Sequence, residues 1–523
     1  LTWDEFSKIN FYLHELSGAR PVLTVGRNYP FNETYTHVLG YVSEASVEDL
    51  VNNETIKERN VPGLRVGKTG LEKALENELI GTNGVQRFEV NAYGKRINQI
   101  DFKEGEQGKT IKLTIDTEIQ KYTHKLLNER AGSISVMDIY TGEIIAMNSS
   151  PSFDPNLFLY GIEKNKWREI RKDPLKPLLN KTVSGLYSPG STIKPLVALS
   201  ALENDVITPN LKVNCRGHKH PLELYGTKYH CWKKQGHGYM SLKNAIKQSC
   251  DTYFYEAARL LGVDRLNETA KKFGLGDVVI GDYFNEKKGV VPSTKWKKEA
   301  IGQNWYLGET IINGIGQGYI QTTPLQLCLM TAQLANGGHK IYPKIIFDNK
   351  QENIEIIKYK MKSAEKKNDE NLKLLTATEK LFRKDEKNYE ALYRNKENVK
   401  FVLDAMFRST NELYGTSFSS RIEDPKYQFA GKTGTAQVKR ITEAERELDL
   451  KTNQIPYKER DHAWYVAFGP YKNPRYAVSI LVEHGGSGSS TAAPIAKKLF
   501  KFVIDRHELR EKAKKKYLVS TDI

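Results

Sequence analysis

Residues 187–203 read Tyr-Ser-Pro-Gly-Ser-Thr-Ile-Lys-Pro-Leu-Val-Ala-Leu-Ser-Ala-Leu-Glu, a loop followed by an apolar helical run. Ser191 therefore lies in the first turn of a predicted helix, where free N–H groups and the helix dipole favour negative charge. Lys194 follows at i+3 on the same face, within reach of the serine hydroxyl. This spacing suits a nucleophile, Ser191, and its base, Lys194, whose pKa must be depressed for the amine to be neutral. Alone, the pattern is more often an ordinary capped helix with a surface lysine.

Two further motifs follow in order along the chain. Ser249-Cys-Asp251 precedes the aromatic run Thr-Tyr-Phe-Tyr, and Lys432-Thr-Gly-Thr435 lies in a β-favouring stretch. A serine in the second motif can relay a proton between Lys194 and a leaving amine, which predicts a catalytic role for Ser249. Because all three motifs occur in this order, the Ser191–Lys194 pattern is not explained well by chance.

The ordered triple resembles the signature of β-lactamases and penicillin-binding proteins. Other stretches extend the resemblance over nearly the whole chain: His37-Val-Leu-Gly-Tyr-Val42, Gly67-Lys-Thr-Gly-Leu-Glu72, Leu113-Thr-Ile-Asp116, Gly314-Ile-Gly-Gln-Gly318, Thr323-Pro-Leu-Gln326 and Asp461-His-Ala-Trp-Tyr465. The chain is most similar to class B penicillin-binding proteins, in particular the elongation-type penicillin-binding protein 2 group. The resemblance implies a peptidoglycan D,D-transpeptidase that cross-links stem peptides through a Ser191 acyl-enzyme and is inhibited by β-lactams. It implies no catalytic cofactor.

The third motif fits recognition of a D-Ala-D-Ala peptide. Lys432 supplies a positive charge, and the hydroxyls of Thr433 and Thr435 can hydrogen-bond the terminal carboxylate. Gly434 is expected to let the substrate backbone lie close against the strand. The backbone N–H groups of Ser191 and Thr435 are candidates for an oxyanion hole.

Asp251 departs from the general family pattern, which has asparagine at this position. An aspartate resembles the elongation type and argues against the division type. We expect Asp251 to belong to the substrate-binding residues, without the amide donor that asparagine would supply.

For residues 1–110 the sequence predicts a mixed, elongated, non-catalytic pedestal domain of the dimerisation type. Short β-like pieces at 36–42 and 85–90 are separated by turns that contain Gly and Pro. No catalytic cluster is evident there.

The stretch 111–510 predicts one α+β transpeptidase domain, an antiparallel sheet with helices on both faces. Residues 133–139 and 143–147 form a predicted hairpin, and 463–468 and 476–482 are apolar enough for central strands. Strands from both ends of the region, with helices between them, indicate a domain closed by its termini.

Two polar segments stand apart from this pattern. The Lys/Glu-rich stretch at about 350–400 is predicted to be an inserted helical excursion, and 511–523 a basic tail. The net charge is +16, which a nucleic acid or an acidic membrane surface would suit. Because the cations are scattered among glutamates, we interpret them as a solvated basic surface and expect no nucleic-acid partner.

Four side chains offer a metal site: Cys215, Cys231, His237 and Cys250. Three thiolates and an imidazole suit tetrahedral zinc. Some elongation-type relatives resemble this arrangement, with carboxylates, a histidine and a cysteine at nearly this spacing. Because Cys250 is the middle residue of the second motif, the metal would clamp the segment beside Ser249 and act structurally.

Two alternatives to zinc remain open at this stage. The first is a Cys215–Cys231 disulfide with Cys250 buried, and the second is unpaired thiols. Three further histidines could change the ligand set: His218, His220 and His230. Cys328 lies in an apolar run and is expected to be a small core residue.

Two other functions use the same motifs. A D,D-carboxypeptidase or β-lactamase would pass the acyl group to water, and carboxypeptidase activity could also accompany transpeptidation. A β-lactam sensor or scaffold would keep only an acylable serine. The long N-terminal part argues against the former, and the lack of signalling domains or extra apolar spans argues against the latter.

The resemblance also implies a location and partners. We expect a single-pass inner-membrane protein with its catalytic domain in the periplasm, its N-terminal anchor missing from this chain, which begins at Leu1. Expected protein partners are a SEDS-type glycosyltransferase and MreC.

Overall fold

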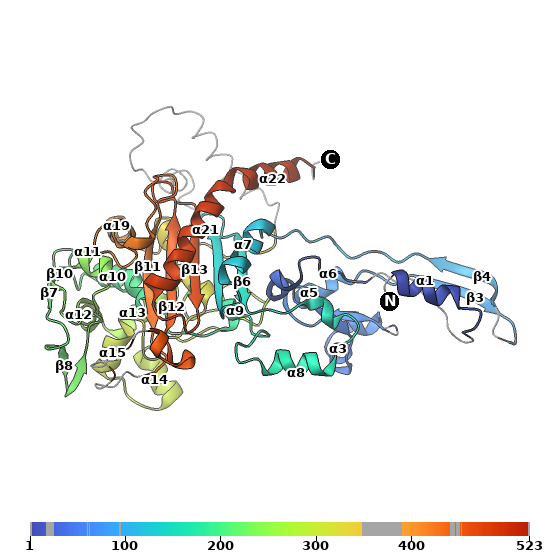
Figure 1. Ribbon diagram of the computed structural model, residues 1–523, viewed down its shortest axis with the longest axis horizontal. Coiled ribbons are helices and arrows are strands. Elements are labelled where there is room, and N and C mark those ends of the chain that lie inside the picture. Colours follow the sequence, from blue (N-terminus) through green and yellow to red (C-terminus); the bar gives the residue numbers. More distant parts are fainter. Residues whose placement is uncertain are drawn as a thin grey trace.

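The computed structural model describes residues 3–16, 26–59, 61, 63–93, 96–347, 390–439, 445, 450 and 452–520. A slender N-terminal part adjoins a bulkier part built around a central sheet (Figure 1). Of the expected insertion at 350–400, residues up to 389 lie outside the described residues, and the remainder leads into helix α19 (Lys396–Asn411).

The central sheet is antiparallel throughout, in the order β11-β12-β13-β5-β6. Its strands are β5 (Gly132–Asp138), β6 (Ile144–Ser150), β11 (Ala430–Ala436), β12 (His462–Gly469) and β13 (Tyr476–Val482). All residues of β5, β6 and β13 are buried, as expected of strands covered on both faces. The two predicted strand pairs are confirmed. Since β13 pairs with β5, the C-terminal strands close the domain on its beginning, and β11 is left at the edge.

Helices cover both faces of this sheet, which confirms the predicted fold. Helix α16 (Pro324–Ala335) packs on β13 and β5 and is buried along its whole length. On the other face α7 (Thr117–Leu127) packs on β6, and α21 (Ala493–Asp505) packs on β12. Cys328, on α16, is fully buried and is the core residue that the sequence predicted.

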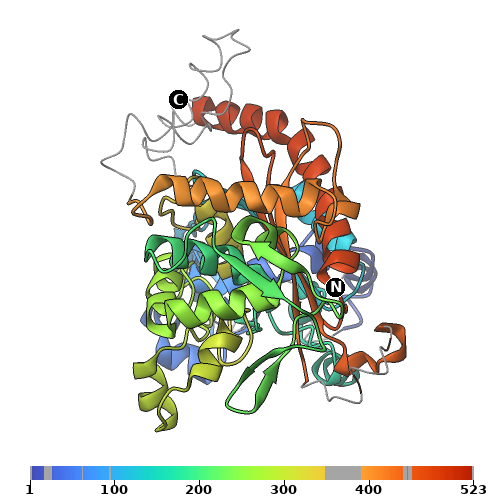
Figure 2. The ribbon, with the colours of Figure 1, turned by 90° about the vertical axis from the view of Figure 1, so that its left-hand side faces the viewer.

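A helical lobe lies beside the edge strand β11 (Figure 2). At its centre α10 (Lys194–Glu203) contacts both α12 (Asp251–Leu261) and α19. The other elements of this part are β7 (Lys212–Cys215), β8 (Leu222–Leu224), β9 (Thr227–Tyr229), β10 (Gly238–Ser241), α11 (Leu242–Lys247), α13 (Val263–Lys272), α14 (Thr294–Ile301) and α15 (Leu307–Asn313). Helix α9 (Lys181–Ser184) lies at the other edge of the sheet, where it packs on β5, β6 and α16.

The N-terminal part is built from short elements. They are α1 (Trp3–Phe11), α2 (Thr36–Leu39), β1 (Val42–Glu44), α3 (Val47–Asn52), α4 (Glu54–Glu58), β2 (Arg65–Gly67), α5 (Gly70–Ala74), α6 (Glu76–Leu79), β3 (Val85–Val90) and β4 (Arg96–Lys103). The last two form an exposed hairpin that extends away from the sheet domain (Figure 1). The predicted strand at 85–90 is confirmed.

The predicted β-like piece at 36–42 is largely wrong, because residues 36–39 form the helical turn α2. Tertiary contacts override its β propensity: Val38 is fully buried, and Thr36 Oγ1 donates to Phe153 O at 2.6 Å. Gly40 ends the turn with φ +81°, a conformation that glycine adopts at little cost.

One segment of the 111–510 stretch packs against the N-terminal part. Asn156 exchanges hydrogen bonds with the backbone of Tyr29, and Arg65 Nε donates to Leu159 O at 2.6 Å. Helix α8 (Lys164–Lys172) follows, and its Ile170 joins Phe153 and other rings in a small apolar cluster. The two parts are thus connected by a chain excursion as well as by the linker before α7.

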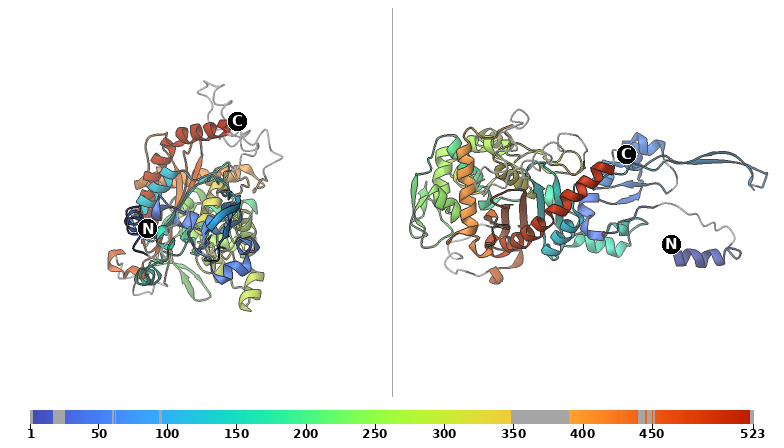
Figure 3. Two further views of the ribbon diagram at one scale, coloured as in Figure 1. Left: turned by 90° about the vertical axis from the view of Figure 1, so that its right-hand side faces the viewer. Right: turned by 90° about the horizontal axis from the view of Figure 1, so that it is seen from above.

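The C-terminal helix α22 (His507–Ser520) projects from the sheet domain (Figure 3) and contains the described part of the predicted 511–523 tail. It begins at a buried ionic group, in which Arg506 and Arg510 contact Asp116, the N-cap of α7. Within the described ranges no helix has both the length and the apolar character needed to span a membrane.

Candidate active site

Ser191 lies in the 3-10 turn Gly190–Ile193, which continues directly into α10. The turn is held close to the edge strand β11. Gly190 has φ +54°, its N–H donates to Gly316 O at 2.9 Å, and a Cβ there would lie 2.6 Å from Thr435 O. Glycine is therefore required where the turn that carries Ser191 meets the strand.

Lys194 is fully buried and points to the second motif. Its Nζ donates to Asp251 Oδ1 at 2.6 Å, to Ser249 O at 3.0 Å and to Ser249 Oγ at 3.3 Å. An ammonium has three donors, and these three acceptors use all of them. Asp251 is thus the charge partner of Lys194, and the amine lies within hydrogen-bond reach of the Ser249 hydroxyl.

Ser249 stands between two lysines. Its Oγ accepts from Lys432 Nζ at 2.8 Å as well as from Lys194. Ser249 also has φ +55°, a left-handed backbone that costs a non-glycine residue about 1 kcal/mol and recurs at functional sites. This backbone places the serine hydroxyl between α10 and β11.

Lys432 is fully buried on β11, where its Nζ also donates to Thr433 O at 2.9 Å. Burial and the nearby Lys194 cation hold the pKa of Lys432 well below its usual value. The depressed pKa makes Lys432 a candidate for proton exchange as well as for the fixed charge that the sequence predicts.

The remaining residues of the third motif follow β11 towards the surface. Thr433 Oγ1 donates to Thr416 Oγ1 at 2.8 Å, and Thr435 is exposed. Gln317 Nε2 donates to Thr435 O at 3.2 Å. These contacts bring two residues from outside the three catalytic motifs to the edge of β11: Gln317, from the stretch 314–318, and Thr416, which no quoted stretch includes.

Gly434 is closely packed within the protein itself. A Cβ at this position would lie 2.7 Å from Thr192 Cγ2 and 3.1 Å from Pro189 O. The glycine therefore lets β11 pack against the turn that carries the nucleophile, on the protein side of the strand.

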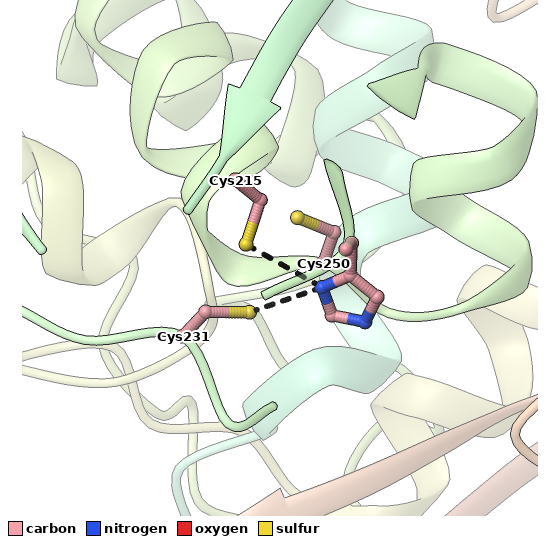
Figure 4. Close-up of side chains that lie close together, drawn as sticks. Cys215, Cys231 and Cys250 are labelled. Carbon is pink, nitrogen blue, oxygen red and sulfur yellow. Dashed lines mark hydrogen bonds between the residues drawn. The ribbon is translucent and has the colours of Figure 1, made fainter. Parts of the chain in front are cut away.

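The four predicted metal ligands form one cluster behind the second motif. The ligand atoms of Cys215, Cys231, His237 and Cys250 all lie within 4.8 Å of one another, with the three thiols turned toward each other (Figure 4). His237 Nδ1 lies 3.5 Å from the sulfurs of Cys215 and Cys231. All four cysteines are free thiols in this structure, an arrangement that fits a metal site. His218 lies outside this set, and its Nε2 contacts Cys231 O.

Three thiols this close cannot ionise independently. Hydrogen bonds from Cys231 and Cys250 lower the pKa of the Cys215 thiol. The contact with Cys215 raises the pKa of Cys231 to about 11, and the contacts with Cys215 and Cys231 also raise that of Cys250. A divalent cation would remove this conflict, because it stabilises several thiolates at once.

One aromatic residue at this site was missed by the sequence reasoning. Trp232 follows the ligand Cys231, and its indole Nε1 donates to Ser249 O at 3.0 Å. Its position next to a predicted ligand was the one available signal, because the contact with Ser249 depends on the fold.

Comparisons with known proteins agree with this geometry. The penicillin-binding protein transpeptidase domain model matches residues 132–501, and the penicillin-binding protein dimerisation domain model matches 1–113. The chain belongs to the penicillin-binding protein transpeptidase family. Its predicted membership and α+β fold are confirmed.

Among curated members of this penicillin-binding protein family, the peptidoglycan D,D-transpeptidase MrdA of Salmonella typhimurium is 34% identical over 489 residues, covering 92% of this chain and 73% of the relative. The Escherichia coli MrdA is 33% identical, covering 88% and 69%. A solved complex of penicillin-binding protein 2 and MreC from Helicobacter pylori matches with TM-score 0.78 and 30% identity, covering 97% and 84%. Pseudomonas aeruginosa PBP2 in complex with WCK 5153 matches with TM-score 0.71 and 34% identity, covering 94% of each chain.

Proposed function

We propose that this chain is a peptidoglycan D,D-transpeptidase of cell elongation, with Ser191 as nucleophile. The observation that carries the proposal is the placement of Ser249 Oγ between Lys194 and Lys432, next to the helical turn of Ser191. The relatives named MrdA, peptidoglycan D,D-transpeptidases, support the same reaction.

The reaction transfers an acyl group. Ser191 Oγ attacks the carbonyl of the penultimate D-Ala, the bond to the terminal D-Ala breaks, and an ester to Ser191 forms. The hydroxyl proton leaves through the Lys194, Ser249 and Lys432 group, and Ser249 delivers a proton to the departing amine. An amine of a second stem peptide then attacks the ester and restores Ser191.

Two parts of the site are proposed to bind the stem peptide: strand β11 and the turn at the start of α10. The hydroxyls of Thr433 and Thr435 and the charge of the lysine pair are proposed to hold the terminal carboxylate. The N–H groups of Ser191 and Thr435 are proposed to stabilise the tetrahedral oxyanion. Asp251, which pairs with Lys194, acts on the substrate through that lysine.

The test is product analysis with two stem peptides, a donor that ends in D-Ala-D-Ala and an amine-bearing acceptor. A cross-linked dimer supports the proposal. A trimmed monomer alone would make the chain a D,D-carboxypeptidase, and no turnover despite covalent labelling by a β-lactam would make it a sensor or scaffold.

We propose that the cysteine cluster holds a structural zinc ion. The ligands are Cys215, Cys231, His237 and Cys250, a donor set that zinc prefers. The buried ring atom His237 Nε2 has no partner among the described residues, while Nδ1 faces the thiols, which suits ligation through Nδ1. When bound, zinc would neutralise the thiolates and join the strand β7 segment to the second motif.

Metal analysis of protein purified without a His tag tests the zinc. One zinc per chain is expected, falling to a small fraction in Cys215→Ser. A chain without stoichiometric zinc and with two fewer titratable thiols would support a disulfide in its place.

The partners and location are also proposals. The Helicobacter pylori complex with MreC and a solved peptidoglycan synthase complex, 28% identical with TM-score 0.70, support MreC and a SEDS-type glycosyltransferase as partners. They fit an inner-membrane protein that exposes both a pedestal, 1–110, and the transpeptidase domain, 111–510, to the periplasm. Co-purification of the chain with each partner's periplasmic or membrane part tests this.

A further inference from the structure

The segment Cys231-Trp232 is tied to the second motif by three kinds of contact. The backbone N–H of Asp251 donates to Cys231 Sγ at 3.4 Å, and the backbone N–H of Trp232 donates to Asp251 Oδ2 at 2.9 Å. The indole Nε1 of Trp232 donates to Ser249 O at 3.0 Å and to Gln248 O at 3.2 Å. Cys231 and Trp232 therefore contact the second motif both through its backbone and through the Asp251 carboxylate.

These contacts reach the acylation machinery through shared acceptors. Asp251 uses Oδ2 for Trp232 and Oδ1 for Lys194, so the tryptophan N–H fixes the carboxylate in the orientation that meets the lysine. The carbonyl of Ser249 likewise accepts from both the indole and Lys194 Nζ. A shift of this turn would move both partners of Lys194 together.

Trp232 is not held in place by burial. The residue is 57% exposed, and its indole packs edge-to-face against His237 with a ring-centroid distance of 5.3 Å. Because the side chain is exposed, apolar burial contributes little to holding it in place. The contact that distinguishes tryptophan from phenylalanine at this position is therefore the Nε1–H hydrogen bond. The Nε1–H bond also reaches Ser249, whose φ is +55°. Surrounding contacts must stabilise such a strained backbone conformation.

We infer that Trp232 is a positioning residue for acylation, which holds the left-handed Ser249 turn and the Asp251 carboxylate so that Lys194 stays aligned with Ser249 and Ser191. The inference rests on the proposed acyl-transfer function. It adds a role for the segment beside the cysteine cluster that is independent of metal binding itself.

The test compares Trp232→Phe with wild type, using a labelled β-lactam and separating non-covalent binding from the first-order acylation step. Loss of one hydrogen bond of about 1.4 kcal/mol corresponds to a factor of ten. We expect about tenfold slower acylation, unchanged non-covalent binding, and unchanged melting temperature, thiol count and zinc content. Trp3→Phe, on the exposed helix α1, is the matched control and should acylate as wild type does.

Wild-type acylation in Trp232→Phe would overturn the inference. So would a decrease in acylation that appears only together with a lower melting temperature or lost zinc, because a purely structural role predicts those changes. A wild-type chain that is not acylated at Ser191 would contradict the proposed function itself, an outcome distinct from both.

Discussion

Lys432 and Ser249, 183 positions apart in the sequence, are joined by a hydrogen bond of 2.8 Å from Nζ to Oγ. The bond connects the edge strand β11 to the turn before α12. Because burial and Lys194 depress the pKa of Lys432, this contact is suited to passing a proton through the Ser249 hydroxyl. We therefore predict that Lys432 takes part in proton transfer as well as in carboxylate binding.

Replacing Lys432 by methionine should abolish most acylation while the fold persists. The substitution removes an amine that is costly to bury and fills its place with an apolar chain of similar length. We expect β-lactam acylation at least about 100-fold slower, the range for a lost proton-transfer group, with a melting temperature equal to or above that of wild type.

Lys181→Met is the matched control for this variant. Lys181 is also fully buried, and its Nζ donates to the carbonyls of Leu175 and Lys176. Its removal should leave acylation near the wild-type rate. Equal acylation rates in wild type and Lys432→Met would remove Lys432 from the mechanism.

Asp251→Ala should destabilise the protein through Lys194. It leaves a fully buried ammonium without its carboxylate, and breaking such a pair costs about 3 kcal/mol. The measurement is urea unfolding at neutral pH. Glu397→Ala breaks the exposed pair with Lys400 and should change the free energy of unfolding little. Equal effects of the two substitutions would show that the Lys194–Asp251 pair does not stabilise the fold.

Thr416→Val tests the hydroxyl that the motifs did not reveal. The change keeps the shape of the side chain but removes the acceptor for Thr433 Oγ1, 2.8 Å away. A freed Thr433 hydroxyl is oriented less well toward a substrate carboxylate, so we expect acylation about tenfold slower, equivalent to one hydrogen bond. Ser419→Ala, exposed in the same loop, should have no effect. Matching rates for the two variants would contradict this role.

Stability should fall in mild acid, in part through His462. Its Nδ1 accepts from His484 N at 3.0 Å, and burial lowers the pKa of His462 to about 4. The unfolded chain binds this proton near pH 6.5 and the folded chain only near pH 4, so stability decreases as the pH falls between these values. The shift corresponds to at most about 3 kcal/mol.

His462→Asn should reduce that dependence, because the amide oxygen can accept from His484 N without titrating. Urea unfolding of both proteins at pH 7 and pH 5 measures the difference. Wild type should lose more stability than the variant over this interval. Identical losses would mean that His462 is not buried in its neutral form.

The sequence predicted the elements with strong local patterns. The strands β12 and β13 are largely apolar runs, and β5 and β6 are joined by a turn that contains glycine, so their type and pairing followed from local pattern. The piece at 36–42 failed because its β-favouring residues form a helical turn held by a distant segment, through the bond from Thr36 to Phe153. Local propensity contains no information about such a contact.

The candidate site likewise has features that the sequence predicted and features that it did not. The motif residues were readable because their chemistry is local to each motif, and so were the four clustered metal donors. The pairing of Lys194 with Asp251, the position of Gly434 against Thr192, and the contact of Trp232 with Ser249 arise only when separate segments meet. These long-range contacts join the separate motifs into one site, which no single motif specifies.

Acylation of wild type and Ser191→Ala by a labelled β-lactam tests the central claim most directly, because Ser191 is partly exposed in a turn and its loss should not disturb the fold. The label should attach to wild type in a 1:1 ratio, at the peptide that contains Ser191, and should be absent from Ser191→Ala of equal melting temperature. Labelling that persists in the variant at the wild-type rate would contradict the account.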